Sequence, residues 1–170
     1  MGISAWHPAK KIRGIELILE DKMVDVITEI TINCPVSQVS EYASNPDHAP
    51  EWYVNIHAVE WKTPKPLQVG TQIAFRAKFL GRELGYVYEI TDYIPTEIMV
   101  MKTANGPFPM ETIYTWKAIG EYQTLMTLRN NGDPKGFNKV ISPFMEPMMR
   151  RANMKDLKKI KAILDSQTCK

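Results

Sequence analysis

The sequence predicts an α+β fold in which a curved antiparallel sheet of about seven strands wraps around a long C-terminal helix. Apolar and polar residues alternate along most of the chain, the breaks between these segments are too short for a crossover helix, and the apolar spacing becomes helical after residue 133. Because a flat sheet with one large helix would leave much of its apolar face in water, the sheet must curl and form a concave pocket.

The first predicted elements are a strand and two short helical segments. Valines and isoleucines alternate with acidic residues over residues 23–33, which is typical of a half-buried strand. A short helix is predicted over residues 35–45, because a proline occupies its first position and an Asn-Pro pair ends it. The next stretch contains two prolines and therefore predicts a second, broken helical turn that reaches Trp52.

Six further strands complete the predicted sheet. They cover residues 55–62, 70–80, 82–94, 97–104, 110–119 and 121–130. The breaks between them are short and rich in proline, glycine and asparagine, which are turn residues. Neighbouring strands are therefore expected to pair in antiparallel fashion.

A long helix up to Leu164 is predicted to close the domain, with a kink near Pro147. Pro143 and Pro147 lie four residues apart and each lacks the N–H of a regular helix. The apolar side chains before the kink, which are mostly Phe and Met, point in a different direction from those after it. Two interpretations stay open: the first half covers the mouth of a cavity, or the whole segment is a bent core helix.

Composition favours one domain, over residues 23–166. The chain has 170 residues, of which 44% are hydrophobic, enough for one substantial core. Charged residues make up 24% and the net charge is +2, which argues against nucleic acid as a partner. The sequence shows no apolar run long enough for an integral membrane segment and no secretion signal, so a cytoplasmic protein is expected.

The two cysteines and the N-terminal arm complete this picture. Cys34 and Cys169 are far apart and lack the spacing of metal ligands, which argues against a metal site and a disulfide framework and suits a reducing cytoplasm. Residues 1–22 form an N-terminal extension whose structure the pattern leaves open. Its apolar residues favour either an added edge strand or a contact with a second subunit in a homodimer.

Aromatic residues on the inward faces of the strands are the candidate ligand-binding residues. In the 70–80 strand Phe75 falls on the apolar face, and two tyrosines share the apolar face of the next strand. Buried phenols usually find a hydrogen-bond partner, so Tyr86 and Tyr88 are candidates for orienting a ligand. The complete predicted set is Trp52, Phe75, Tyr86, Tyr88, Tyr114, Trp116, Phe144 and Met148.

The sequence supplies no catalytic or cofactor-binding set. His7, His48 and His57 show neither the order of a nucleophilic triad nor the spacing of a metal site, so they are interpreted as ordinary residues. Arg129 and Glu89 are isolated charges within strands, and such charges are usually solvated. No catalytic residue, metal or cofactor is predicted.

Several segments together resemble a known superfamily. They are PVSQVSEYASNPDHAPEW after the first strand, PLQVGTQIAF, LGRELGYVYEITDYIP and the terminal SPFMEPMMRRANMKDLKKIKAIL. The sequence is similar to the START, polyketide-cyclase and plant-allergen superfamily known as SRPBCC, nearest its bacterial polyketide-cyclase and lipid-transport branch, over about residues 23–165. The resemblance implies a helix-grip fold with a cavity between the sheet and the C-terminal helix, and members that bind lipids, sterols, polyketides or aromatic molecules. It carries over no catalytic position.

The leading functional hypothesis is binding of an apolar small molecule, such as a lipid, polyketide or aromatic compound, between the sheet and the C-terminal helix. The alternative is a polyketide cyclase or aromatase that acts in the same cavity, which requires an acid or base with a shifted pKa. A third hypothesis, a protein-interaction module built on the basic half of the last helix, ranks last. The sequence favours a binder over an enzyme.

Overall fold

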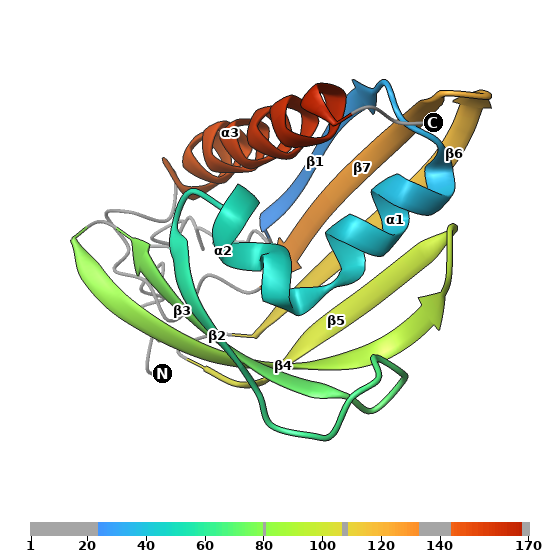
Figure 1. Cartoon of the computed structure of the whole chain (residues 1–170). Coiled ribbons are helices and arrows are strands. Elements are labelled where there is room, and N and C mark those ends of the chain that lie inside the picture. Colours follow the sequence, from blue (N-terminus) through green and yellow to red (C-terminus); the bar gives the residue numbers. More distant parts are fainter. Residues whose placement is uncertain (1–23, 80, 107–108, 133–143, 168–170) are drawn as a thin grey trace, which may run out of the picture.

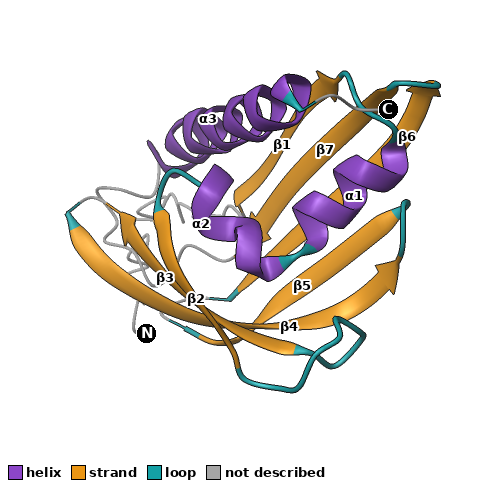
Figure 2. Cartoon of the chain, in the orientation of Figure 1, coloured by secondary structure: helices purple, strands orange, loops and turns teal. Residues whose placement is uncertain are grey.

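A seven-stranded antiparallel sheet curls around the helices in the computed structural model, which describes residues 24–79, 81–106, 109–132 and 144–167 (Figures 1 and 2). The strand order is β1-β7-β6-β5-β4-β3-β2, so consecutive strands from β2 to β7 are neighbours and β1 lies at the free edge of β7. The strands are β1 (Val24–Ile32), β2 (Ile56–Trp61), β3 (Gln72–Phe79), β4 (Arg82–Ile94), β5 (Ile98–Asn105), β6 (Met110–Gly120) and β7 (Gln123–Gly132). The predicted fold class is confirmed.

The helices cover the concave face of this sheet. They are α1 (Val36–Ser44), the 3-10 turn η1 (Pro46–His48), α2 (Ala49–Trp52) and α3 (Met145–Ser166). In Figures 1 and 2, α3 crosses above β1 and β7, whereas α1 and α2 lie in front of the central strands. The two short helical segments after the first strand lie where the proline pattern predicts them.

The predicted kink near Pro147 is wrong, because α3 runs as one helix from Met145 to Ser166. Pro147 lies in the first turn of α3, where backbone N–H groups have no partner within the helix, so a proline interrupts nothing. The earlier part of the predicted helix, including Pro143, lies outside the described residues. The predicted N-terminal extension over residues 1–22 also lies outside them.

The main core lies between the concave face of the sheet and the inner faces of the helices. Leu157, Ile160 and Leu164 of α3 are almost fully buried, as expected for residues that recur every three to four positions. Each buried leucine or isoleucine contributes roughly 1.5–3 kcal/mol by leaving water. This apolar packing holds α3 against the sheet.

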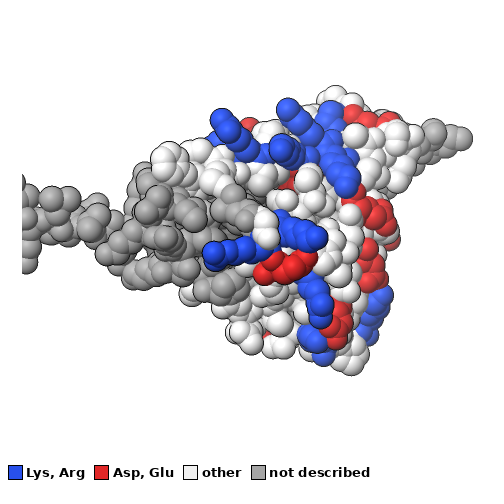
Figure 3. All heavy atoms as spheres, turned by 90° about the vertical axis from the view of Figure 1, so that its left-hand side faces the viewer, with Lys and Arg blue, Asp and Glu red and all other residues white. Residues whose placement is uncertain are grey.

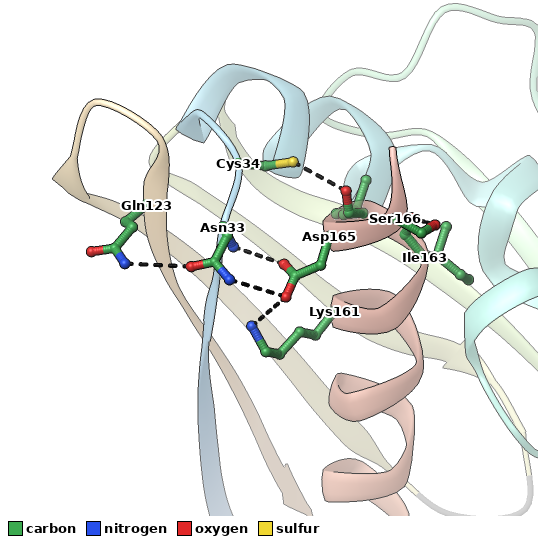
Figure 4. A network of polar contacts seen from close by, with 8 residues as sticks. Asn33, Cys34, Gln123, Lys161, Ile163, Asp165 and Ser166 are labelled. Atoms are coloured by element: carbon green, nitrogen blue, oxygen red, sulfur yellow. Dashed lines mark hydrogen bonds and ion pairs between the residues drawn. The ribbon is translucent and has the colours of Figure 1, made fainter. Parts of the chain in front are cut away.

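A polar network fixes the C-terminal end of α3 to the end of β1 (Figure 4). The carboxylate of Asp165 accepts hydrogen bonds from the Asn33 backbone N–H at 2.8 Å, the Asn33 side-chain amide at 3.1 Å and the Lys161 ammonium at 2.6 Å. Burial opposes ionisation of Asp165, but the bonds from Lys161 and Asn33 outweigh it and lower its pKa. Gln123 at the start of β7 extends the network by donating to the Asn33 side chain at 3.4 Å.

Cys34 corrects one expectation from the sequence. Its side chain is fully buried between β1 and α1, with its sulfur 3.4 Å from the carbonyl oxygen of Leu164, and it is disulfide-bonded. The distance between cysteines along the chain does not measure their distance in space, so wide spacing does not exclude a disulfide. The inference of a reducing compartment therefore loses this support.

Candidate functional site

Buried aromatic side chains form a continuous group on the inner face of the sheet. Phe75 of β3 meets Tyr88 of β4 edge to face, with ring centroids 5.9 Å apart, and Tyr114 stacks on Trp116 within β6 at 6.2 Å. Trp52 of α2 packs edge-on against Tyr114 at 6.4 Å. All five belong to the predicted ligand-binding set, and each is less than one-tenth exposed. The structure therefore brings these five predicted residues together in one core.

A small cavity lies beneath α1, η1 and α2, against this aromatic group. Its volume is about 20 Å³, enough for about one water molecule. Trp52, Phe75 and Tyr114 line it, and the remaining lining residues are Ala43, Ser44, Asn45, Pro46, Ala49, Tyr53, Ile73, Ile90, Met99 and Met101. The aromatic side chains thus fill most of the space beneath α1, η1 and α2. A molecule larger than water enters only if side chains or the short helices move.

Two tryptophan side chains carry polar groups without partners. The indole N–H groups of Trp52 and Trp116 are buried and meet no hydrogen-bond acceptor in the described part of the structure. A buried donor without an acceptor costs about 1–3 kcal/mol, which makes such groups rare in native proteins. Trp52 lines the small cavity, so its N–H is available to a molecule that binds there.

The other three predicted residues are not among those that line this cavity. Tyr86 is half-buried in β4 with its ring centroid 6.0 Å from that of Tyr88. Phe144 precedes α3 and is 63% exposed. Met148 lines a different hollow at the surface, between α3 and the residues that follow α2. Tyr86 nevertheless lies directly opposite the lining residue Phe75 in the β3–β4 ladder and packs against the core.

A buried polar cluster lies beside the aromatic group, and the sequence reasoning missed it. The Asn153 side-chain amide of α3 donates to the Asn130 carbonyl oxygen at 2.8 Å, and the Asn130 amide donates to the Thr112 hydroxyl at 2.9 Å. On the neighbouring Tyr88 hydroxyl, burial is the larger effect and raises its pKa, whereas Thr103 and Thr112 lower it. The two hydrogen bonds link α3 to β7 and β6 through buried side chains.

Asp156 is the buried acid of this region. Asp156 is 4% exposed, and its Oδ1 accepts a hydrogen bond from the Val54 backbone N–H at 2.8 Å. Burial raises the pKa of Asp156 to about 7, although the Val54 hydrogen bond and the charges of Lys159 and Lys155 act in the opposite direction. At neutral pH the carboxyl is therefore about half protonated.

Two buried phenols lie close to that acid. The hydroxyl groups of Tyr53 and Tyr114 are hydrogen-bonded to each other. Burial is the main cause that raises the pKa of each phenol, and the negative charge of Asp156 raises both further. Both phenols are therefore neutral at physiological pH and can donate a hydrogen bond. Asp156 therefore acts on both phenols through its charge.

His48, His57 and the isolated strand charges lie outside this region. His48 and His57 pair with Glu51 and Glu83 at the surface, and Arg129 makes a two-pronged ion pair with Asp25. Glu89 accepts a hydrogen bond from Gln72 at 3.0 Å, and His7 lies outside the described residues. Across the described ranges no group of three or more His, Cys, Asp or Glu side chains is arranged to hold a metal ion. No helix in those ranges is long and apolar enough to cross a membrane.

Residues 23–165 match the model of the family described as polyketide cyclase / dehydrase and lipid transport. This chain belongs to that family. The resemblance to the SRPBCC superfamily is thereby confirmed. No curated protein sequence is similar enough to match the chain.

Solved structures with the family's fold agree. The Zhui aromatase/cyclase from Streptomyces sp. R1128 superposes with a TM-score of 0.72 at 13% identity, covering 85% of this chain and 94% of that one. A START superfamily protein from Mycobacterium smegmatis gives 0.73 at 10% identity, covering 83% and 97%. Major latex-like protein 151 from Panax ginseng gives 0.65 at 14% identity, covering 84% and 97%. At these identities the likeness shows the helix-grip fold alone.

The sequence pattern of α3 could have indicated part of the buried polar cluster. Asn153 and Asp156 share the helical face of Leu157, Ile160 and Leu164, so they interrupt an otherwise apolar stripe. A polar residue on such a stripe is expected to be buried and therefore paired. Tyr53 gave no such signal, because its position follows a short helix whose direction the sequence does not determine.

Proposed function

We propose that this chain binds an apolar small molecule that carries a hydrogen-bond acceptor, in the space that the sheet encloses with α1, η1 and α2. The observation that carries the proposal is the buried Trp52 N–H beside the cavity, which no acceptor among the described residues satisfies. A ligand carbonyl at this place would remove the cost of the unpaired donor. Membership of a family described by polyketide cyclisation and lipid transport supports an apolar ligand.

The walls of the cavity suit such a ligand. Ile73, Ile90 and Phe75 present apolar surface, and Met99 and Met101 supply flexible side chains that adapt to different shapes. Because the cavity holds about one water molecule, ligand entry must be coupled to its expansion. The apparent affinity is then the affinity of the expanded cavity multiplied by the fraction of molecules in which the cavity is expanded.

The tyrosines have a different part in this proposal from the one the sequence suggested. The Tyr88 ring packs edge to face against Phe75, which lines the cavity, so Tyr88 contributes mainly its ring. Trp52 takes over the orienting role. Tyr86, Phe144 and Met148 remain proposed contacts for a ligand that extends beyond the cavity.

A pair of probes that differ only in an acceptor tests the role of Trp52. The native protein is expected to bind 2-acetylnaphthalene about fivefold more tightly than 2-ethylnaphthalene, since one neutral hydrogen bond is worth about 1 kcal/mol. In Trp52→Phe the preference should disappear while binding of 2-ethylnaphthalene persists. Fluorescence titration or calorimetry measures both dissociation constants.

Trp61→Phe is the matched control for this experiment. The Trp61 N–H donates to Asp47 at 2.7 Å, away from the cavity, so this variant should keep the native preference. Failure of both naphthalenes to bind at millimolar concentration would contradict apolar binding. A preference that survives in Trp52→Phe would show that another group recognises the acceptor.

Asp156 favours a second candidate function, a cyclase or aromatase that acts in the same interior. A buried carboxyl with a pKa of about 7, close to the paired phenols of Tyr53 and Tyr114, can donate or accept a proton at neutral pH. With an aromatisable poly-β-ketone as substrate, turnover should follow a pH profile with an inflection near 7, and Asp156→Asn should abolish it. Turnover by Asp156→Asn at the native rate would exclude this role, and retained 2-acetylnaphthalene binding would show that the interior is intact.

A further inference from the structure

A hollow of about 180 Å³ lies at the surface between α3 and the residues that follow α2. Its lining residues are Val54, Asn55, Met148, Arg151, Ala152 and Lys155. Four of these residues belong to α3 and have the spacing i, i+3, i+4 and i+7, so they face the hollow from one side of the helix. It is about nine times larger than the cavity beneath α2, so it admits a chemical group without rearrangement of the core.

The hollow combines apolar surface with two positive charges. Val54, Met148 and Ala152 supply the apolar part, and Val54 is 51% exposed. Arg151 and Lys155 lie one helical turn apart and are both exposed. A molecule seated here would meet an apolar wall and two cations at once.

The two cations make no hydrogen bond or ion pair with any described residue, in contrast to their neighbours. Arg150 donates to the Ile27 carbonyl oxygen at 2.8 Å and lies 3.6 Å from Glu146, and Lys161 is paired with Asp165. In Figure 3 basic side chains gather at the top of the molecule, where α3 lies in Figure 1. Arg151 and Lys155 are therefore available to a negatively charged group from outside the chain.

We propose that this hollow binds the acidic end group, carboxylate or phosphate, of an amphipathic small molecule whose apolar part rests on Val54 and Met148. Arg151 offers two parallel N–H donors and Lys155 a point charge, a combination suited to planar carboxylates and to phosphates. The inference goes beyond the proposed function, because it does not require the cavity beneath α2 to open.

The hollow is also joined to the buried acid. Val54, which lines the hollow with its side chain, donates its backbone N–H to Asp156, the residue that follows Lys155. Both sides of the hollow are therefore connected to the buried Asp156: Val54 by a hydrogen bond, and Lys155 as its neighbour in the chain. This continuity favours a small molecule whose acidic end stays outside over a flat membrane surface as the occupant.

Octyl phosphate and octanol, used below the concentration at which they form micelles, test the proposal on isotopically labelled protein. Octyl phosphate should bind about tenfold more tightly than octanol and shift the backbone amide signals of Asn55, Ala152 and Lys155. In the double variant Arg151→Gln/Lys155→Gln the two affinities should agree within about twofold. The double variant Lys158→Gln/Lys159→Gln removes the same charge from α3, including one that acts on Asp156, and should keep the tenfold preference.

Three results would overturn the proposal. Equal binding of octanol and octyl phosphate by the native protein would exclude recognition of the acidic group. Inorganic phosphate binding as tightly as octyl phosphate would exclude a role for Val54 and Met148. Binding to anionic phosphatidylserine vesicles without binding to monomeric octyl phosphate would assign the surface to a membrane instead. None of these readouts depends on Trp52, so failure here is distinguishable from failure of the proposed function.

Discussion

Asp156→Asn is expected to raise the free energy of unfolding at pH 8 by about 2–4 kcal/mol, because each unit by which burial raises the pKa of a carboxyl costs about 1.4 kcal/mol once it ionises. The Asn side chain keeps an oxygen that can accept the Val54 N–H, so the substitution removes the charge and leaves the hydrogen bond. Few single substitutions stabilise a protein by this much, and those that do are often at functional positions.

The stability of the native protein should depend on pH because of Asp156. The pKa of Asp156 is about 7 in the folded chain, against an ordinary value of 3.8. Between these values the folded state holds a proton that the unfolded state has lost, so stability falls as pH rises from about 4 to about 8. Urea unfolding at pH 5 and pH 8 should show this fall in the native protein and a much smaller one in Asp156→Asn.

Asp165→Asn is the matched control, with the opposite expected sign. The pKa of Asp165 is lowered, so its charge stabilises the folded state above the ordinary pKa and that contribution is lost only in acid. Asp165→Asn should therefore destabilise the protein at pH 8, by about 1 kcal/mol for a partly exposed pair. An Asp156→Asn variant that keeps the native pH dependence would show that Asp156 is ionised at little cost.

Asn130→Ala is expected to destabilise the protein by about 2–4 kcal/mol, from the lost side-chain volume and from the unpaired amide of Asn153. Asn130 is only 9% exposed and joins Asn153 to Thr112. Thr112 loses a donor to its hydroxyl oxygen, whereas the Asn153 amide loses its acceptor, so the main polar cost falls on Asn153. Thermal and urea unfolding measure the change.

The adjacent asparagine supplies the control for Asn130. Asn131 points to the other face of β7, is half-buried and donates to Glu111 at 3.0 Å. The same substitution there should cost less than about 1 kcal/mol, since water can replace the lost partner. In the double variant Asn130→Ala/Asn153→Ala the two losses should not add, and strict additivity would argue against the network.

The alternation of side chains carried most of the fold prediction, because an exact period of two leaves little freedom in which face of a strand is buried. Phe75, Tyr114 and Trp116 could therefore be placed on the inner face from the residue pattern alone. The position of Phe144 could not be predicted in this way, because it depends on where α3 begins. The residue pattern predicts a longer helix that includes Phe144, whereas α3 begins one residue after it. The direction of α3 over the sheet decides which of its polar residues are buried, so Asp156 and its pKa required the three-dimensional arrangement.

The pairing of β1 with β7 has a consequence for how the chain is made. Thr28 of β1 lies opposite Leu128 of β7, a hundred residues later, so β1 leaves the ribosome well before the strand with which it pairs. Until β7 is made, the valine and isoleucine side chains of β1 and its unpaired backbone groups are open to other chains. Contacts this distant along the chain slow folding, and nascent chains that expose such a strand are substrates for chaperones.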